Sequence, residues 1–113
     1  MKETKFKIWD KRVGIMMGPY TIQQMWEWTH KEKHSSQDLI FLQFTGLKDK
    51  NDKEIYEGDI LQWSDLTNIK NRWEVKFTNS GWNPFIDDMT TDKPFRYEII
   101  GNIYENQKLL KEN

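Results

Sequence analysis

The sequence predicts an α+β, mostly β fold: a small curled sheet with one short helix in the N-terminal half and an SH3-like, barrel-type C-terminal half. Short runs of alternating apolar residues, separated by turn residues, recur along the chain, which is typical of small sheets that close on themselves. Strong helical signals are confined to one segment after residue 20. Six Trp, four Tyr and six Phe supply the apolar area of a core, although 31% of the residues are charged.

The length favours a single domain, and the composition favours a cytoplasmic protein. A chain of 113 residues supports one core. We expect a single domain over residues 1–113, made of a hairpin, helix and strand lobe (1–56), an SH3-like lobe (57–106) and a tail (107–113). The absence of cysteine excludes disulfides, thiolate metal sites and a cysteine nucleophile. Because no long apolar run is present, we expect neither a signal peptide nor a membrane span.

The first elements are predicted to be a β-hairpin and a helix. Phe6 and Ile8 alternate with Lys5, Lys7 and Trp9, which predicts a first strand. The apolar run from Val13 to Met17 predicts the second strand of the hairpin. We expect Gly18-Pro19 to end that run. Thr21 and Gln24 have the spacing of a capping box, which predicts a helix over about 21–33.

A covered strand and a second hairpin are expected next. After a linker at 34–37, residues 38–44 carry apolar side chains on both faces, which is typical of a central strand. Residues 43–47 are predicted to pair with 54–56 across the polar turn 48–53, which we expect to be too polar for burial.

The C-terminal half is predicted to contain further short strands. Gly58 precedes a strand at 59–63, and a loop follows over 64–71. Residues 72–78 alternate, with Trp73, Val75 and Phe77 on one face.

The remaining segments complete the predicted sheet. Residues 82–86 form a short strand, 87–94 a polar excursion, and 95–100 the closing strand. We expect Gly101 to permit a sharp bend and Leu109-Leu110 to lie in a short tail helix.

Three sequence blocks resemble a known family. They are Phe6-Lys7-Ile8-Trp9-Asp10, then Leu42 to Lys50 with Glu54 to Ile60, and Ile100-Gly101-Asn102-Ile103-Tyr104-Glu105-Asn106. Their order and span resemble the YopX-like family of phage and prophage proteins. The resemblance implies a phage or prophage origin, a bacterial host, a mostly β fold and a role that has not been assigned, so it implies no catalytic residues. Gln107 stands where the family usually has proline, and residues 18–37 and 87–93 match no family pattern.

The spacing of the His and acidic residues gives little support for a metal site or a catalytic carboxylate site. His30 and His34 share a helix face but lack a third convincing ligand, so we interpret them as exposed side chains near a helix end. The acidic groups Asp87-Asp88-Asp92 and Asp49-Asp52 fall in predicted loops rather than on rigid elements. Glu57 and Asp59 flank Gly58, where one of them can accept hydrogen bonds from turn amides. We therefore predict no metal and no cofactor.

A nucleic-acid surface is the alternative functional hypothesis. The candidates are three basic residues of one strand region and two aromatic residues that could stack on bases if they are exposed: Lys70, Arg72, Lys76, Trp63 and Trp82. Against this hypothesis, seventeen basic and eighteen acidic residues nearly cancel in the whole chain. Aromatic residues of a small barrel also fill its core first.

Protein–protein interaction or assembly is the favoured hypothesis. Ile22, Met25, Trp26 and Trp28 cover more of the helix circumference than one small core needs, and aromatic and Met residues are enriched at interface cores. A homo-oligomer or a contact with a host or phage protein would use them. No nucleophile motif, phosphate loop or zinc-protease helix occurs, so we expect the protein not to be an enzyme.

Overall fold

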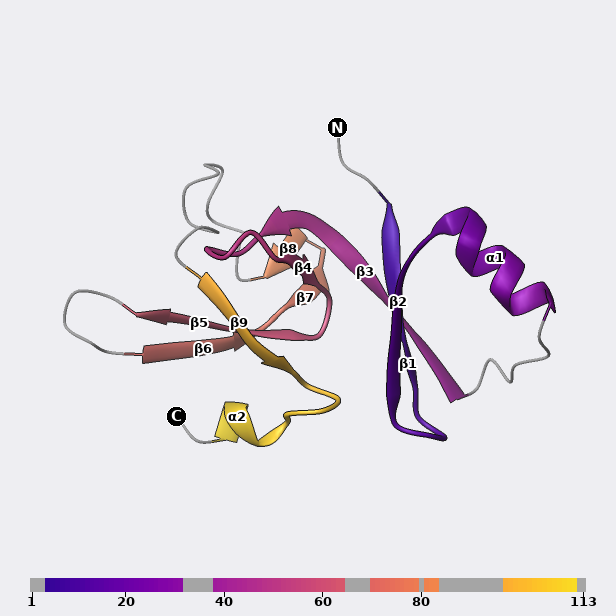
Figure 1. Ribbon diagram of the computed structural model, residues 1–113. Helices are drawn as coiled ribbons and strands as arrows, with labels where there is room; N and C mark the ends of the chain where they lie inside the picture. The colour runs from indigo at the N-terminus through magenta and orange to yellow at the C-terminus, as the bar shows by residue number, and fades with distance from the viewer. Residues whose placement is uncertain (1–3, 32–37, 65–69, 80, 84–96, 112–113) are drawn as a thin grey trace.

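The computed structural model describes residues 4–31, 38–64, 70–79, 81–83 and 97–111 (Figure 1). In chain order the described elements are β1 (Lys5–Asp10), β2 (Ile15–Thr21), α1 (Ile22–Lys31), β3 (Leu39–Lys48), β4 (Glu54–Tyr56), β5 (Asp59–Ser64), β6 (Lys70–Glu74), β7 (Lys76–Thr78), β8 (Gly81–Asn83), β9 (Tyr97–Asn102) and α2 (Lys108–Lys111). The predicted mostly β fold with short helices is confirmed. None of the helices in these ranges is long and apolar enough to cross a membrane.

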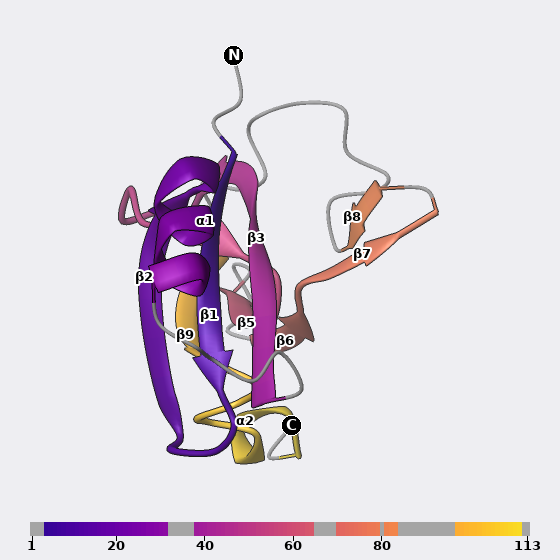
Figure 2. The same ribbon diagram turned by 90° about the vertical axis from the view of Figure 1, so that its right-hand side faces the viewer.

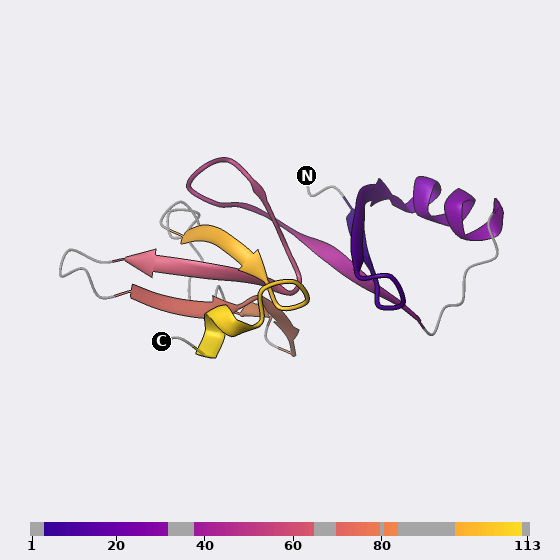
Figure 3. The same ribbon diagram turned by 60° about the horizontal axis from the view of Figure 1, so that its bottom comes forward.

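The strands form three hydrogen-bonded groups with the orders β2-β1-β3-β4, β6-β5-β9 and β7-β8. The long strand β3 joins the two halves of the molecule: it begins beside β1 and curls away to pair with β4 (Figure 3). We call residues 5–43 the N-terminal lobe and the described residues from 44 onward the C-terminal lobe.

The opening hairpin of β1 and β2 is confirmed, but the predicted break at Gly18-Pro19 is wrong. β2 continues through both residues to Thr21. The pairing shifts register between Phe6 and Ile8, which accommodates an extra residue on β2 as a bulge. Because β2 is an edge strand, a proline without an N–H removes no bond to an outer neighbour.

The predicted capping box starts helix α1. The backbone N–H of Gln24 donates to Oγ1 of Thr21 at 3.2 Å, and the backbone N–H of Thr21 donates to Oε1 of Gln24 at 2.9 Å. Two amide groups that the helix itself cannot satisfy are thereby paired. The helix is described as far as Lys31, and residues 32–33 of the predicted helix lie outside the described residues.

The β2-β1-β3 layer separates α1 from the C-terminal lobe (Figure 1). Ile8 pairs with Met17 and Phe41, so these three side chains share one face. Trp9 points to the opposite face, where its ring centroid lies 5.7 Å from that of Tyr104 in the C-terminal lobe. The Ile8 face is therefore the one that α1 covers, and Ile8 is completely buried.

The predicted second hairpin is confirmed, but its turn is not wholly exposed. Phe44 pairs with Tyr56 and Lys48 with Glu54. Asp49, at the start of the turn, is only 1% exposed. One carboxylate oxygen accepts from the backbone amides of Asn51 and Lys53, and the other accepts from the amide of Ile99 on β9. A charged residue can be buried here because its oxygens are hydrogen-bonded.

The alternating segment 72–78 is divided into two strands, which corrects the prediction of one strand. β6 pairs with β5, whereas β7 pairs with β8. The break falls at Val75, whose N–H donates to the Asp59 carbonyl and whose carbonyl accepts from the Gly58 N–H. Beyond this point the chain leaves the β5 sheet, so Phe77 is 64% exposed instead of sharing the core with Val75.

The core of the C-terminal lobe combines residues from β3 through β9. Its buried members are Ile55, Leu61, Val75, Trp82 and Tyr97, with Leu47, Trp63, Trp73 and Ile99 packed against them. The last part of β3 and β4 thus pack with the later strands. Trp82, predicted in a strand at 82–86, lies in β8, and residues 84–86 and the excursion 87–94 lie outside the described residues.

Two glycines leave room for side chains that pack closely against the backbone. Gly58 has φ +86°, and a Cβ there would lie 2.9 Å from the ring of Tyr104. Gly101 lies within β9 rather than at a sharp bend, and a Cβ there would lie 2.5 Å from Oδ1 of Asn106. The predicted tail helix is confirmed as α2, whose Leu109 carbonyl accepts from the Arg72 guanidinium at 2.8 Å.

Candidate interaction surface

Two of the predicted interface residues lie on the outer side of α1. Ile22 is 55% exposed and Trp26 is 60% exposed, and their spacing of four residues places them one helical turn apart on the same side. Met25 is half-buried. Trp28 belongs to α1, but its side chain lies outside the described residues.

Three further exposed apolar residues lie in the same lobe, and the sequence analysis did not select them. Val13 in the β1–β2 turn is 54% exposed, Ile15 on β2 is 52% exposed, and Phe41 on β3 is 39% exposed. Ile15 and Phe41 point to the same face of the sheet, because Ile15 pairs with Asp10 and Phe41 with Ile8, two residues along β1. Val13 and Ile15 lie in the apolar run 13–17, and Phe41 lies in the segment 38–44 with apolar residues on both faces. Such runs indicate burial and do not show that the face is only partly covered.

The partial cover follows from the position of α1. The helix packs on β2 and β1, and in Figure 2 it lies in front of these two strands while β3 passes beside it. Phe41 on β3 therefore remains accessible next to the helix. We call Val13, Ile15, Ile22, Trp26 and Phe41 the N-terminal apolar surface. They account for five of the six exposed large apolar residues in the described ranges, and Phe77 is the sixth.

The aromatic candidates for nucleic-acid stacking are engaged in the C-terminal lobe. Trp82 is 8% exposed in the core, with its ring centroid 4.8 Å from that of Phe77, so the condition that it be exposed is not met. Trp63 is half-buried and packs against the same core, with its centroid 6.5 Å from that of Tyr97.

The basic candidates have intramolecular partners where they are described. Arg72 donates to the side-chain oxygen of Gln62 at 3.1 Å and to the Leu109 carbonyl at 2.8 Å. The ammonium of Lys76 lies 3.8 Å from the carboxylate of Glu74. Lys70 is the first residue of β6, and its side chain lies outside the described residues. Of the two basic candidates whose side chains are described, Arg72 is therefore engaged within the chain and Lys76 lies close to an acidic side chain.

The polar residues considered for metal binding are only partly described. His34 and the acidic residues 87–92 lie outside the described ranges, as does the side chain of His30. Within the ranges that the structure describes, no three His, Asp or Glu side chains gather in a way that could hold a metal ion. Asp59 fulfils the structural role predicted for one residue beside Gly58, because its carboxylate accepts from the Tyr56 N–H at 2.7 Å.

Comparisons with known proteins agree with the architecture. The crystal structure of protein EF1440 from Enterococcus faecalis is similar to this chain with a TM-score of 0.67 and 22% sequence identity, covering 97% of this chain and 99% of that one. At this identity the likeness shows the fold alone. No curated protein matches the chain. The family model described as YopX protein matches residues 3–111, nearly the whole chain. This chain therefore belongs to the YopX family.

Proposed function

We propose that this protein is a non-enzymatic accessory protein of phage or prophage origin, acting in the cytoplasm of the bacterial host by assembling with a second copy of itself. The support for this origin is the resemblance of the three sequence blocks to the YopX-like family of phage and prophage proteins, together with the match of the YopX family model to residues 3–111. The observation that carries the assembly role is the concentration of exposed apolar side chains on the N-terminal lobe.

The shape of this lobe favours a second copy as the occupant. Helix α1 covers β1 and β2 and exposes Ile22 and Trp26 on its outer side. On the same face of the sheet, the helix does not cover Phe41 of the neighbouring strand β3. A two-fold contact uses the same surface on both partners. The α1 ridge of each copy would then lie over the uncovered β3 face of the other and complete the helical layer of both sheets.

The energetic requirement is met only if several residues of this surface take part. Fully burying a large apolar side chain contributes about 1.5–3 kcal/mol, whereas association costs on the order of 4–15 kcal/mol in lost rigid-body freedom. A two-fold contact buries each residue twice, but Ile22, Trp26 and Phe41 are only 39–60% exposed in the single chain. Their burial therefore offsets only the lower part of this cost, and the contact must also include Val13 or Ile15. The net charge of −1 adds little long-range repulsion between copies.

Nucleic-acid binding receives less support from the described residues. Trp82 is in the core, Arg72 is held by Gln62 and α2, and Lys76 is close to Glu74. The experiment below therefore includes DNA, so that nucleic-acid binding would be detected.

Light scattering behind size exclusion tests the proposal. We expect the wild-type chain to have a mass above the monomer and an Ile22→Lys/Trp26→Lys double variant to be monomeric. Phe77→Lys is the matched control, because Phe77 is a similarly exposed apolar residue on the other lobe and its replacement should leave the mass unchanged. A monomeric wild-type chain would refute self-assembly. Added single- and double-stranded DNA should neither change the mass nor quench tryptophan fluorescence; salt-sensitive quenching would instead favour the nucleic-acid alternative.

A further inference from the structure

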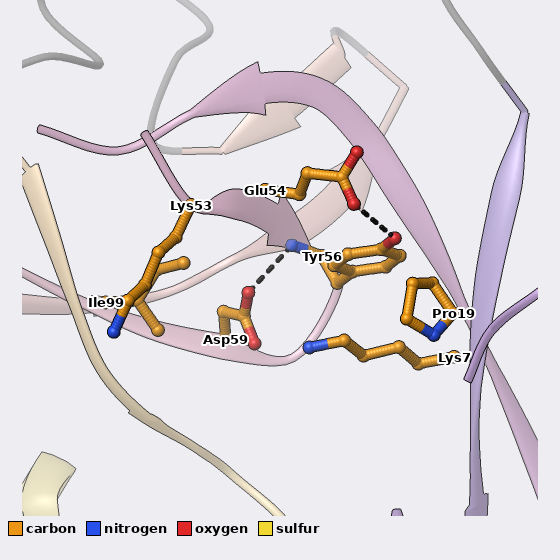
Figure 4. Close-up of a pocket in the computed structure, with 7 residues that line it drawn as sticks. All are labelled: Lys7, Pro19, Lys53, Glu54, Tyr56, Asp59 and Ile99. Atoms are coloured by element: carbon orange, nitrogen blue, oxygen red, sulfur yellow. Dashed lines mark hydrogen bonds between the residues drawn. The ribbon is translucent and has the colours of Figure 1, made fainter. Parts of the chain in front are cut away.

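A pocket of about 320 Å³ lies at the junction of the two lobes. β1 and β2 contribute Lys7 and Pro19, and the C-terminal lobe contributes Glu54 and Tyr56 of β4, Asp59 of β5 and Ile99 of β9, with Lys53 from the turn before β4 (Figure 4). This volume is at the lower end of the range for small-molecule sites. None of these residues belongs to the N-terminal apolar surface.

Asp59 presents a buried carboxylate oxygen to this pocket. The residue is only 6% exposed. Its Oδ2 accepts from the Tyr56 N–H at 2.7 Å, and no donor among the described residues is hydrogen-bonded to its Oδ1. Burial raises the pKa of this carboxyl to about 6, and the nearby Asp49 carboxylate acts in the same direction, against the Tyr56 N–H and Lys7. A buried polar oxygen that lacks a protein partner is the group that a ligand would satisfy.

Lys7 and Lys53 line the pocket from opposite sides. In Figure 4, Lys7 extends toward the Asp59 carboxyl from one side and Lys53 ends on the other. The Lys7 ammonium lies 4.6 Å from the centre of the Tyr56 ring. Neither ammonium is within 4.0 Å of a carboxylate oxygen of a described residue.

The remaining acidic group of the pocket is already paired. The carboxylate of Glu54 accepts from the Lys5 ammonium and, at 3.0 Å, from the Tyr56 hydroxyl. Burial tends to raise the pKa of Glu54, but the hydrogen bonds and the positive charge of Lys5 outweigh it and lower the pKa. Glu54 therefore remains charged and bound to Lys5, which leaves Lys7 and Lys53 for an external anion.

We propose that this pocket binds a small organic anion that carries a hydroxyl or amino group beside its carboxylate or phosphate. The anionic group lies between the ammonium groups of Lys7 and Lys53, and the hydroxyl or amino group donates to Oδ1 of Asp59. The carbon skeleton contacts Pro19 and Ile99. Because both lobes line the pocket, the bound anion bridges them.

Calorimetric titration of the full-length protein tests this assignment with four probes. Glycerol 3-phosphate and malate each combine an anion with a hydroxyl group, whereas inorganic phosphate and glycerol each supply one part alone. We expect at least one combined probe to bind at least tenfold more tightly than either part. Equal affinity for glycerol 3-phosphate and inorganic phosphate, with no malate binding, would reduce the site to an adventitious ion only and overturn the proposal.

Substitutions assign the binding to this pocket. We expect Lys7→Gln, Lys53→Gln and Asp59→Asn each to lower the affinity for the preferred probe at least tenfold. Lys76→Gln, which changes an exposed lysine of β7, should leave this affinity unchanged. Lys53 is exposed, so its variant remains folded and keeps the test decisive even if the other two are unstable. Unchanged binding by Lys53→Gln, or no binding of any probe by the wild-type chain, would overturn the proposal.

Discussion

The carboxylate of Asp49, in the turn between β3 and β4, accepts a hydrogen bond from the backbone amide of Ile99 on β9 at 3.0 Å. Beside this bond, the Lys50 N–H donates to the Tyr97 carbonyl at 2.9 Å. The turn therefore continues the hydrogen bonding of β9 on the side away from β5. Through this contact a polar turn becomes part of the C-terminal sheet.

Asp49→Ala should lower the free energy of unfolding by about 3 kcal/mol, because it removes the acceptor of three backbone amides in a buried site. Urea denaturation followed by tryptophan fluorescence measures the loss. Asp52→Asn is the control: the Asp52 side chain is 82% exposed, and its ion pair with Lys48 spans 3.7 Å. We expect the control to change stability by less than about 0.5 kcal/mol. Equal effects of the two substitutions would contradict the role of Asp49.

Gly58→Ala should destabilise the protein more than Gly81→Ala does. Both glycines have positive φ, +86° and +118°, but a Cβ at 58 meets the Tyr104 ring at 2.9 Å, whereas a Cβ at 81 meets no atom within 4 Å. Backbone strain alone costs about 1–3 kcal/mol, and the contact with Tyr104 adds to it at position 58. Thermal unfolding of both variants measures the difference. Similar melting temperatures would show that the Tyr104 ring moves aside at little cost.

The stability of the protein should depend on the ionisation of Asp59. Its pKa is about 6 in the folded chain, compared with 3.8 as the ordinary value. Between these pH values the folded state holds a proton that the unfolded state has released, so the free energy of unfolding falls as the pH rises from about 4 to about 6. The full loss, about 3 kcal/mol for a shift of this size, persists at neutral pH.

Asp59→Asn removes this titration and keeps an acceptor for the Tyr56 N–H. The stability of the variant relative to the wild type should therefore increase between pH 4 and pH 7 and stay constant above pH 7. Urea denaturation at a series of pH values measures it. An Asp59→Asn stability difference that does not change with pH would contradict the prediction.

Thr21→Ala should destabilise α1 by about 1 kcal/mol, because the Gln24 N–H loses its cap. A double-mutant cycle with Gln24→Ala should give a positive coupling energy, since each side chain accepts from the other's backbone. Denaturation followed by far-ultraviolet circular dichroism provides the measurement. Gln23→Ala is the control, because the Gln23 amide lies 3.4 Å from the Glu27 carboxylate at an exposed position. A coupling no larger than that of a Gln23–Thr21 cycle would argue against the capping box.

The features predicted correctly from the sequence depend on residues close together in the chain. The hairpins at 5–21 and 43–56 follow from alternation and turn residues, and the start of α1 follows from Thr21 and Gln24. The wrong predictions have a different origin. Pro19 stays within β2 because that strand is at an edge, and β6 ends at Glu74 because Val75 bonds to Gly58 and Asp59.

The sequence by itself determined the family, through three blocks of residues, and the mostly β class with its two hairpins, because alternation, capping and turn formation act over a few residues. Only the tertiary structure decided which side chains are accessible: Trp82 is in the core while Trp26 is exposed. It also brought Lys7 beside Asp59. Burial and long-range pairing depend on segments that are distant in the chain, and no local pattern records which distant segment will cover a given residue.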